Sequence, residues 1–67
     1  MEWVETKKGD TWHLFDKDGV SAAYVTLMTF HGVYEACVPA TGFECTCRTP
    51  EDAMRLIDRH LEDATRE

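Results

Sequence analysis

The stretch TPEDAMRLIDRHLEDAT, residues 49–65, decides the fold. It predicts an amphipathic α-helix, which is the clearest secondary-structure element in the sequence. Thr49 is a suitable N-cap, and Pro50 suits the first helical turn. The two acids that follow complement the positive end of the helix dipole. With about 3.6 residues per turn, one stripe of this helix is apolar and needs a surface to pack on. That stripe contains Ala53, Met54, Ile57, Leu61 and Ala64, flanked by Leu56 and His60.

The residues before this helix predict the sheet on which it packs. Turn signals with glycine, at residues 8–10, 16–19, 31–32 and 39–42, separate runs rich in β-branched and aromatic residues. We expect strands at residues 2–7, 11–15, 21–29, 33–38 and 43–47, the first of them as an edge strand. In the longest, Ala23, Val25 and Leu27 share one face, and the opposite face is also fairly apolar. One face should meet the helix, and the other should be covered by Trp3 or Trp12 or serve as a contact surface.

These patterns predict a single α+β domain over residues 1–67. It is a small antiparallel meander of three to five strands, followed by one C-terminal amphipathic α-helix packed on one face. A chain of 67 residues has room for one core, and a chain of this size buries only about 60% of the surface that its unfolded form exposes. A deep pocket between domains is therefore not expected.

The charge of the chain narrows its partners. Thirteen Asp and Glu oppose seven Lys and Arg, a formal net charge of −6, and between residues 20 and 47 the only charges are Glu35 and Glu44. Direct binding of DNA or RNA normally needs a basic stripe, which this sequence lacks. An acidic surface instead attracts basic protein surfaces, often the grooves that bind nucleic acid. The alternative is that the charge only keeps a small domain soluble.

The N-terminal residues are acidic and lack an apolar run, and no stretch approaches the roughly 20 apolar residues needed to span a bilayer. We therefore expect no signal peptide, no membrane contact and a cytoplasmic location. The oligomeric state stays open between monomer and homodimer, because a sheet that is apolar on both faces can dimerise.

The three cysteines are an odd number, which speaks against a complete disulfide framework. Cys45 and Cys47 share a face of one expected strand, and Cys37 lies on the preceding strand of the same hairpin. We expect small, buried apolar side chains at all three positions. A zinc site completed by a histidine and a cross-strand disulfide are the alternatives, although the spacing differs from that of zinc knuckles. The prediction is therefore that the domain uses no cofactor.

Catalytic patterns are also missing from the sequence. The three histidines, His13, His31 and His60, are scattered, and no Ser or Cys is spaced to act with a histidine and a carboxylate. Residues 16–19 resemble the start of a calcium loop, but the later acidic ligands are absent, so they predict a hairpin turn. The aromatic residues suit core and interface roles, since base stacking would need basic neighbours. We therefore expect a protein that is not an enzyme.

The outer surface of the expected helix is banded in charge. One acidic row contains Glu51, Asp58 and Glu62, a basic row contains Arg55, Arg59 and Arg66, and a second acidic row contains Asp52, Asp63 and Glu67. Pairs four residues apart, Glu51–Arg55 and Glu62–Arg66, should each contribute about 0.3 kcal/mol to helix stability. These bands are either a solvated face laced with ion pairs or a surface that binds a partner.

One family resemblance lies in residues 32–53. The pattern Gly32-x-Tyr34-x-Ala36-x-Val38-Pro39-x-x-x-Gly42-Phe43, followed by residues 49–53 (TPEDA), resembles the core of HicB-type antitoxins. That resemblance implies a partial RNase H-like sheet that binds and neutralises a small RNA-cleaving toxin. The sequence departs from the family at Cys47-Arg48, where the family has Gly-Asp, and it has an additional N-terminal hairpin and no DNA-binding tail. In size and charge the chain is also similar to phage and mobile-element accessory proteins of the anti-CRISPR type.

The sequence therefore predicts a small acidic inhibitor or adaptor without enzymatic activity. It would bind a basic, nucleic-acid-handling protein and occlude its nucleic-acid site. The predicted contacts are Glu51, Asp52, Asp58, Glu62 and Asp63 on the helix, with Glu35 and Glu44 on the sheet. One alternative is an antitoxin-like module that neutralises a toxin through its sheet, and another is a domain that binds nucleic acid directly, which the charge disfavours.

Overall fold

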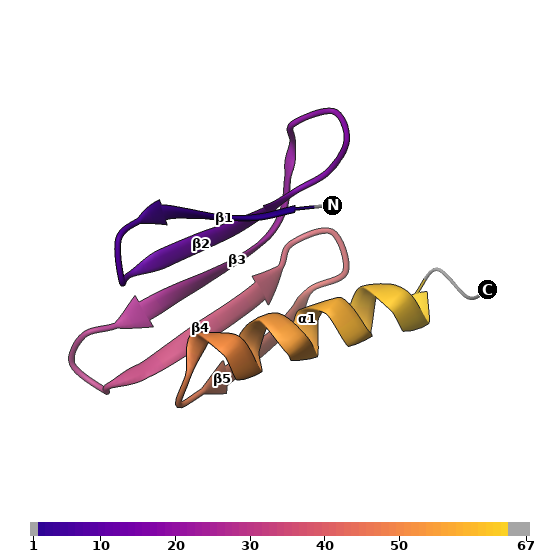
Figure 1. The fold of residues 1–67 in the computed structure, drawn as a ribbon. Helices are drawn as coiled ribbons and strands as arrows, with labels where there is room; N and C mark the ends of the chain where they lie inside the picture. The colour runs from indigo at the N-terminus through magenta and orange to yellow at the C-terminus, as the bar shows by residue number, and fades with distance from the viewer. Residues whose placement is uncertain (1, 65–67) are drawn as a thin grey trace.

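The computed structural model describes residues 2–64 and has an α+β fold (Figure 1). Five antiparallel strands form one sheet in the order of the chain: β1 (Glu2–Lys7), β2 (Thr11–Phe15), β3 (Ser21–Met28), β4 (Val33–Val38) and β5 (Phe43–Cys47). Helix α1 (Pro50–Ala64) follows and packs on one side of the sheet. The predicted meander and C-terminal helix are confirmed, and β3 ends one residue earlier than expected. The predicted helix end at residue 65, and the row positions Arg66 and Glu67, lie outside the described residues.

The turn between β2 and β3 shows why the strands begin and end where they do. The Asp16 carboxylate accepts hydrogen bonds from the backbone N–H groups of Asp18 (2.8 Å) and Val20 (3.0 Å). Gly19 adopts a positive φ of 78°, a conformation that costs glycine little. The antiparallel pairing of β2 with β3 on either side of these residues confirms the predicted hairpin turn.

The strand register assigns residues to the two faces of the sheet. Val25 lies opposite both Trp12 and Ala36, and Ala36 lies opposite Cys45. Cross-strand partners share a face, so these four side chains are on the side that meets α1. The buried core on this side consists of Leu14, Ala23, Val25, Ala36, Val38, Ala53 and Ile57. Partly buried residues surround it: Trp3, Trp12, Tyr34, Phe43, Cys45, Cys47, Met54 and Leu61.

The inner face of α1 is narrower than the predicted stripe. Ala53 and Ile57 are fully buried, and Met54 and Leu61 pack at the border of the core. Ala64 is exposed, and Leu56 is 41% exposed. Figure 1 gives the reason at the C-terminal end, where the last turn of the helix extends beyond the β4–β5 turn and no longer has the sheet beneath it.

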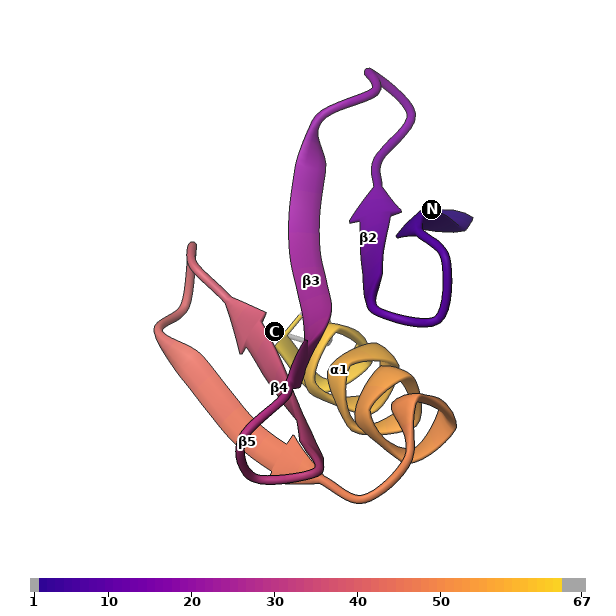
Figure 2. The ribbon, with the colours of Figure 1, turned by 90° about the vertical axis from the view of Figure 1, so that its left-hand side faces the viewer.

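The first two strands twist away from the plane of β3–β5 (Figure 2). The Trp3 side chain reaches from β1 to the helix, where it donates its Nε1–H to an Asp58 carboxylate oxygen at 3.1 Å. Trp3 lies opposite Leu14, and Trp12 lies opposite Val25, so both indoles are on the helix side. The expectation that Trp3 or Trp12 covers the second face of the sheet was therefore wrong.

Candidate functional site

The face of the sheet opposite α1 is the candidate functional site, and we call it the helix-free face. The register places on it the alternate residues of each strand, and among residues 2–64 the one helix lies on the other side. Its members are Glu2, Val4, Lys7, Thr11, His13, Phe15, Ala22, Tyr24, Thr26, Met28, Val33, Glu35, Cys37, Glu44 and Thr46. Most of these side chains are half-buried. The face is therefore a broad surface of apolar, aromatic and polar side chains that a partner could cover.

An aromatic cluster lies at the centre of this face. The His13 ring stacks against Phe15, with ring centroids 5.9 Å apart, and lies 6.0 Å from the Tyr24 ring. His13 Nδ1 is also 2.8 Å from the Ser21 hydroxyl, which fixes the orientation of the imidazole. No carboxylate of the described residues is hydrogen-bonded to this histidine, so the pair lacks the third group of a catalytic triad. The three rings therefore form one aromatic surface across β2 and β3.

Cys37 and Tyr24 form a second contact on the helix-free face. Cys37 lies between Tyr24 and Glu44 in the register and is only 8% exposed. The hydrogen bond with the Cys37 thiol raises the pKa of the Tyr24 phenol, and the charge of the ionised thiol, burial and the carboxylates of Glu35 and Glu44 raise it further. The phenol therefore keeps its proton at neutral pH and uses it in the hydrogen bond with Cys37, and its oxygen can still accept a hydrogen bond from a partner.

Two carboxylates border the aromatic cluster. Glu35 lies opposite Thr26 and Thr46, and Glu44 lies opposite Cys37, so the two glutamates are diagonal neighbours on β4 and β5. Strands β2 to β5 contain no Lys or Arg. At the other end of the face, a hollow of about 450 Å³ is lined by Glu2, Phe15, Asp16 and Lys17. The basic residues beside this face are Lys17 at that end and Lys7 on edge strand β1, opposite Thr11, while Glu35 and Glu44 lie on β4 and β5.

The structure separates the predicted sheet contacts from the predicted helix contacts. Glu35 and Glu44 are on the helix-free face, whereas the acids of α1 project from the other side of the domain. Two of the helix acids are already used within the fold. Asp58 accepts the hydrogen bond from Trp3, and Asp52 lies 3.7 Å from the Arg55 guanidinium, which was expected to pair with Glu51. The predicted set therefore cannot act as one continuous acidic patch.

The cysteines do not meet as the zinc and disulfide hypotheses require. Cys37 lies on the helix-free face opposite Glu44, while Cys45 and Cys47 face α1, and all three thiols are free. Residues 2–64 contain no group of three or more His, Cys, Asp or Glu side chains that could hold a metal ion. The zinc alternative that combined Cys37 with Cys45 and Cys47 does not fit this register, because the turn between β4 and β5 puts the Cys37 thiol on the opposite face from the other two.

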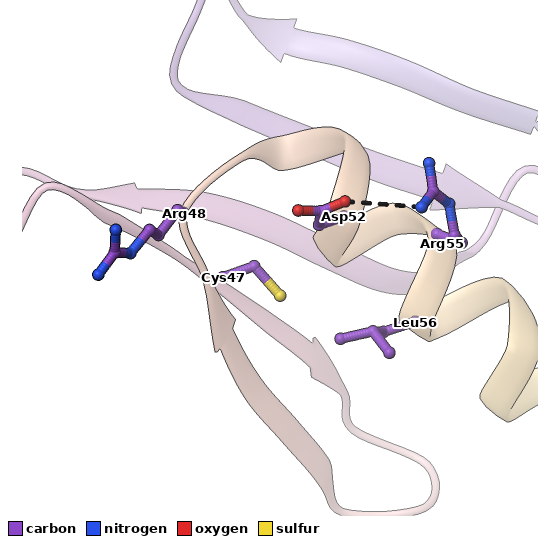
Figure 3. A pocket seen from close by; sticks show the side chains of 5 residues that line it. All are labelled: Cys47, Arg48, Asp52, Arg55 and Leu56. Atoms are coloured by element: carbon purple, nitrogen blue, oxygen red, sulfur yellow. Dashed lines mark ion pairs between the residues drawn. The ribbon is translucent and has the colours of Figure 1, made fainter.

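The remaining histidine contact involves the helix. His60 stacks on Phe43, with ring centroids 4.3 Å apart, and its Nε2 atom is 2.8 Å from the Thr41 hydroxyl. It holds the last turns of α1 to the β4–β5 turn. A pocket of about 380 Å³ lies at the opposite end of this helix–strand contact, lined by Cys47, Arg48, Asp52, Arg55 and Leu56 (Figure 3).

Sequence reasoning missed the aromatic cluster because it assigned the aromatic residues to core and interface roles without separating the two faces. In β2, both alternating sets, Trp12 with Leu14 and His13 with Phe15, are apolar or aromatic, so the pattern alone does not identify the buried set. The shared face of His13 and Tyr24 follows only once the β2–β3 register is known.

Comparisons with protein-family models, with curated proteins and with solved structures found no match to this chain. Within residues 2–64, no helix has both the length and the apolar character needed to cross a membrane.

Proposed function

We propose that this domain is a non-enzymatic inhibitor or adaptor that binds a basic surface on a nucleic-acid-handling protein and blocks that surface. The single observation that supports this proposal best is the helix-free face, in which an aromatic cluster is bordered by Glu35 and Glu44. A net charge of −6 would add long-range attraction to a basic partner.

Arginine is the partner residue that fits this face best. A guanidinium can stack on an aromatic ring and at the same time donate two parallel hydrogen bonds to a carboxylate. The rings of His13 and Tyr24 and the carboxylates of Glu35 and Glu44 offer both kinds of contact on neighbouring strands. Arginines that bind phosphates use the same N–H donors, so an arginine bound to this face could not bind the phosphates of nucleic acid.

The acids of α1 are secondary in this proposal. Asp58 and Asp52 are engaged with Trp3 and Arg55, and withdrawing either would cost the fold a hydrogen bond or an ion pair. Glu51 and Asp63 are exposed and can still add to the long-range field. We therefore expect the sheet glutamates to determine affinity and the helix acids to influence mainly the association rate.

A second candidate function is an antitoxin-like module that neutralises a toxin through apolar contacts of the sheet. One specific observation favours it: Phe30, in the turn between β3 and β4, is 99% exposed, and Val4 on the helix-free face is 40% exposed. Large exposed apolar side chains are typical anchors of interfaces. Salt separates the two candidates, because apolar docking tolerates salt, whereas pairing of glutamates with arginines weakens as ionic strength rises.

The test is an NMR titration of the ¹⁵N-labelled domain with octa-arginine and, in parallel, with octa-lysine. We expect shifts at helix-free-face residues and tighter binding of octa-arginine, since lysine carries the same charge but stacks and pairs less well. Shifts confined to α1, or equal affinity for the two peptides, would contradict the proposed face.

A matched pair of variants refines this test. Glu35→Gln/Glu44→Gln and Glu51→Gln/Asp63→Asn both remove two negative charges, the first pair from the sheet and the second from the helix. The sheet pair should lower octa-arginine affinity more than the helix pair. Blocking is tested with a short fluorescein-labelled oligonucleotide bound to octa-arginine: the wild-type domain should release it, and the sheet pair should release it less efficiently.

A further inference from the structure

Two thiols lie side by side on the helix side of edge strand β5. Cys45 and Cys47 are separated by one residue, and they are opposite Ala36 and Tyr34 on β4. A strand rises about 3.3 Å per residue, so side chains two positions apart start roughly 6.6 Å from each other and point the same way. Both are partly buried against the core and neither forms a disulfide. Their sulfur atoms can therefore converge on one point without any change in the backbone.

The pocket beside α1 gives this pair of thiols access to solvent. The side chain of Cys47 points into the pocket between the end of β5 and the first turns of α1, so one of the two sulfurs borders a solvent-accessible space (Figure 3).

The charged groups around this pair favour an anionic complex. Arg48 follows β5 directly, and Arg55 reaches the same pocket from α1, while Asp52 lies 3.7 Å from the Arg55 guanidinium and so is partly neutralised. The other titratable groups that face the pair are Tyr34 on β4 and, beyond Phe43, the His60 imidazole. The pocket lining therefore has a net positive charge, because two guanidinium groups oppose one carboxylate, and this charge would favour a bis-thiolate with a net negative charge.

We propose that Cys45 and Cys47 form a two-coordinate site for a soft monovalent metal ion, with Cu(I) as the best-fitting ion. Soft thiolate ligands favour Cu(I), zinc and iron–sulfur clusters over the other biological metals. Each thiol releases its proton to solvent, each sulfur forms one bond to the ion, and the oxidation state of copper does not change. A structural zinc site needs four ligands, and residues 2–64 contain no group of three or more His, Cys, Asp or Glu side chains that could hold a metal ion. This pair would therefore favour an ion that is stable with two ligands.

The test is an anaerobic titration of the whole domain with Cu(I) in competition with a chromogenic Cu(I) chelator. Wild type should bind one ion per chain. Cys45→Ser and Cys47→Ser should each weaken binding by more than about 100-fold, because loss of even an outer-shell partner costs about 10- to 100-fold. Cys37→Ser is the matched control, since Cys37 is on the opposite face, and it should bind like wild type.

Further measurements keep the result interpretable. Circular dichroism of each variant checks that the fold is retained, and X-ray absorption of the wild-type complex should show two sulfur ligands. If Cys37→Ser weakens binding as much as the other variants, or if the chelator removes all Cu(I) from folded wild type, the site does not exist. The site is independent of the helix-free face, so octa-arginine binding should be unchanged in Cys47→Ser.

Discussion

Replacing Ile57 with alanine should remove most of the domain's stability. Ile57 is 0% exposed and lies at the centre of the contact between α1 and the sheet. Truncating a buried Ile to Ala typically costs about 2–5 kcal/mol, from lost transfer free energy and the cavity that remains. A single core in a domain of this size rarely supplies more than about 3–5 kcal/mol. The substitution should therefore leave a substantial fraction of the chain unfolded at room temperature.

Urea unfolding followed by tryptophan fluorescence measures this effect, since Trp3 and Trp12 both pack at the border of the core. With a slope of about 1 kcal/mol per molar urea, typical of a small protein, the midpoint should fall by about 2 M or more. Leu56→Ala is the matched control, because Leu56 is the preceding residue and is 41% exposed. Its effect should stay within about 1 kcal/mol.

Two outcomes would refute the packing described for α1. Equal midpoint shifts in Ile57→Ala and Leu56→Ala would mean that Ile57 is not the residue that packs α1 against the sheet. A change in the slope with an unchanged midpoint would mean that the substitution altered the unfolded state rather than the core.

Three further predictions rest on single contacts. Trp3→Phe removes the hydrogen bond to Asp58 and should lower the free energy of unfolding in urea by about 0.5–1.5 kcal/mol. Trp12→Phe is the control for the loss of an indole, because Trp12 does not form this bond. An equal decrease in both variants would contradict the prediction. Glu35→Gln/Glu44→Gln should reduce the salt dependence of octa-arginine binding, measured by calorimetry between low and physiological salt, more than Glu51→Gln/Asp63→Asn does. The Tyr24 pKa is raised in the folded protein, so its contribution to stability is fully present below the unfolded-state value of about 10 and is lost as pH rises through the folded-state pKa. Spectrophotometric titration of tyrosinate should show this late ionisation, and Cys37→Ser should bring it to lower pH.

The elements of the fold could be predicted because local chemistry determines them. Asp16 and Gly19 build the β2–β3 turn. Thr49 caps α1 as expected, since its hydroxyl accepts the Asp52 backbone N–H at 3.2 Å. Each of these signals depends on residues a few positions apart, which the sequence displays directly.

The assignment of side chains to faces could not be predicted in the same way. A shift of one residue in register exchanges the two faces of a strand, and irregularities lie between Glu5 and Lys7 and between Leu14 and Phe15. Trp12 was for this reason expected as a cover of the face away from the helix, although it lies opposite Val25 on the helix side. Of the candidate site, Glu35 and Glu44 were predicted as sheet contacts from charge alone, whereas the aromatic cluster beside them needed the register.

The chain-order arrangement of the sheet has a consequence for how the domain folds. Each strand pairs with its sequence neighbour, so every sheet contact closes a short loop, and the entropy lost in closing such loops is small. The hydrogen bond between Trp3 and Asp58 is different, because 55 positions separate its partners. Hairpins should therefore form early, and the joining of β1 to α1 should complete the fold. A stopped-flow experiment on Trp12→Phe, with Trp3 as the remaining fluorophore, would time that last event.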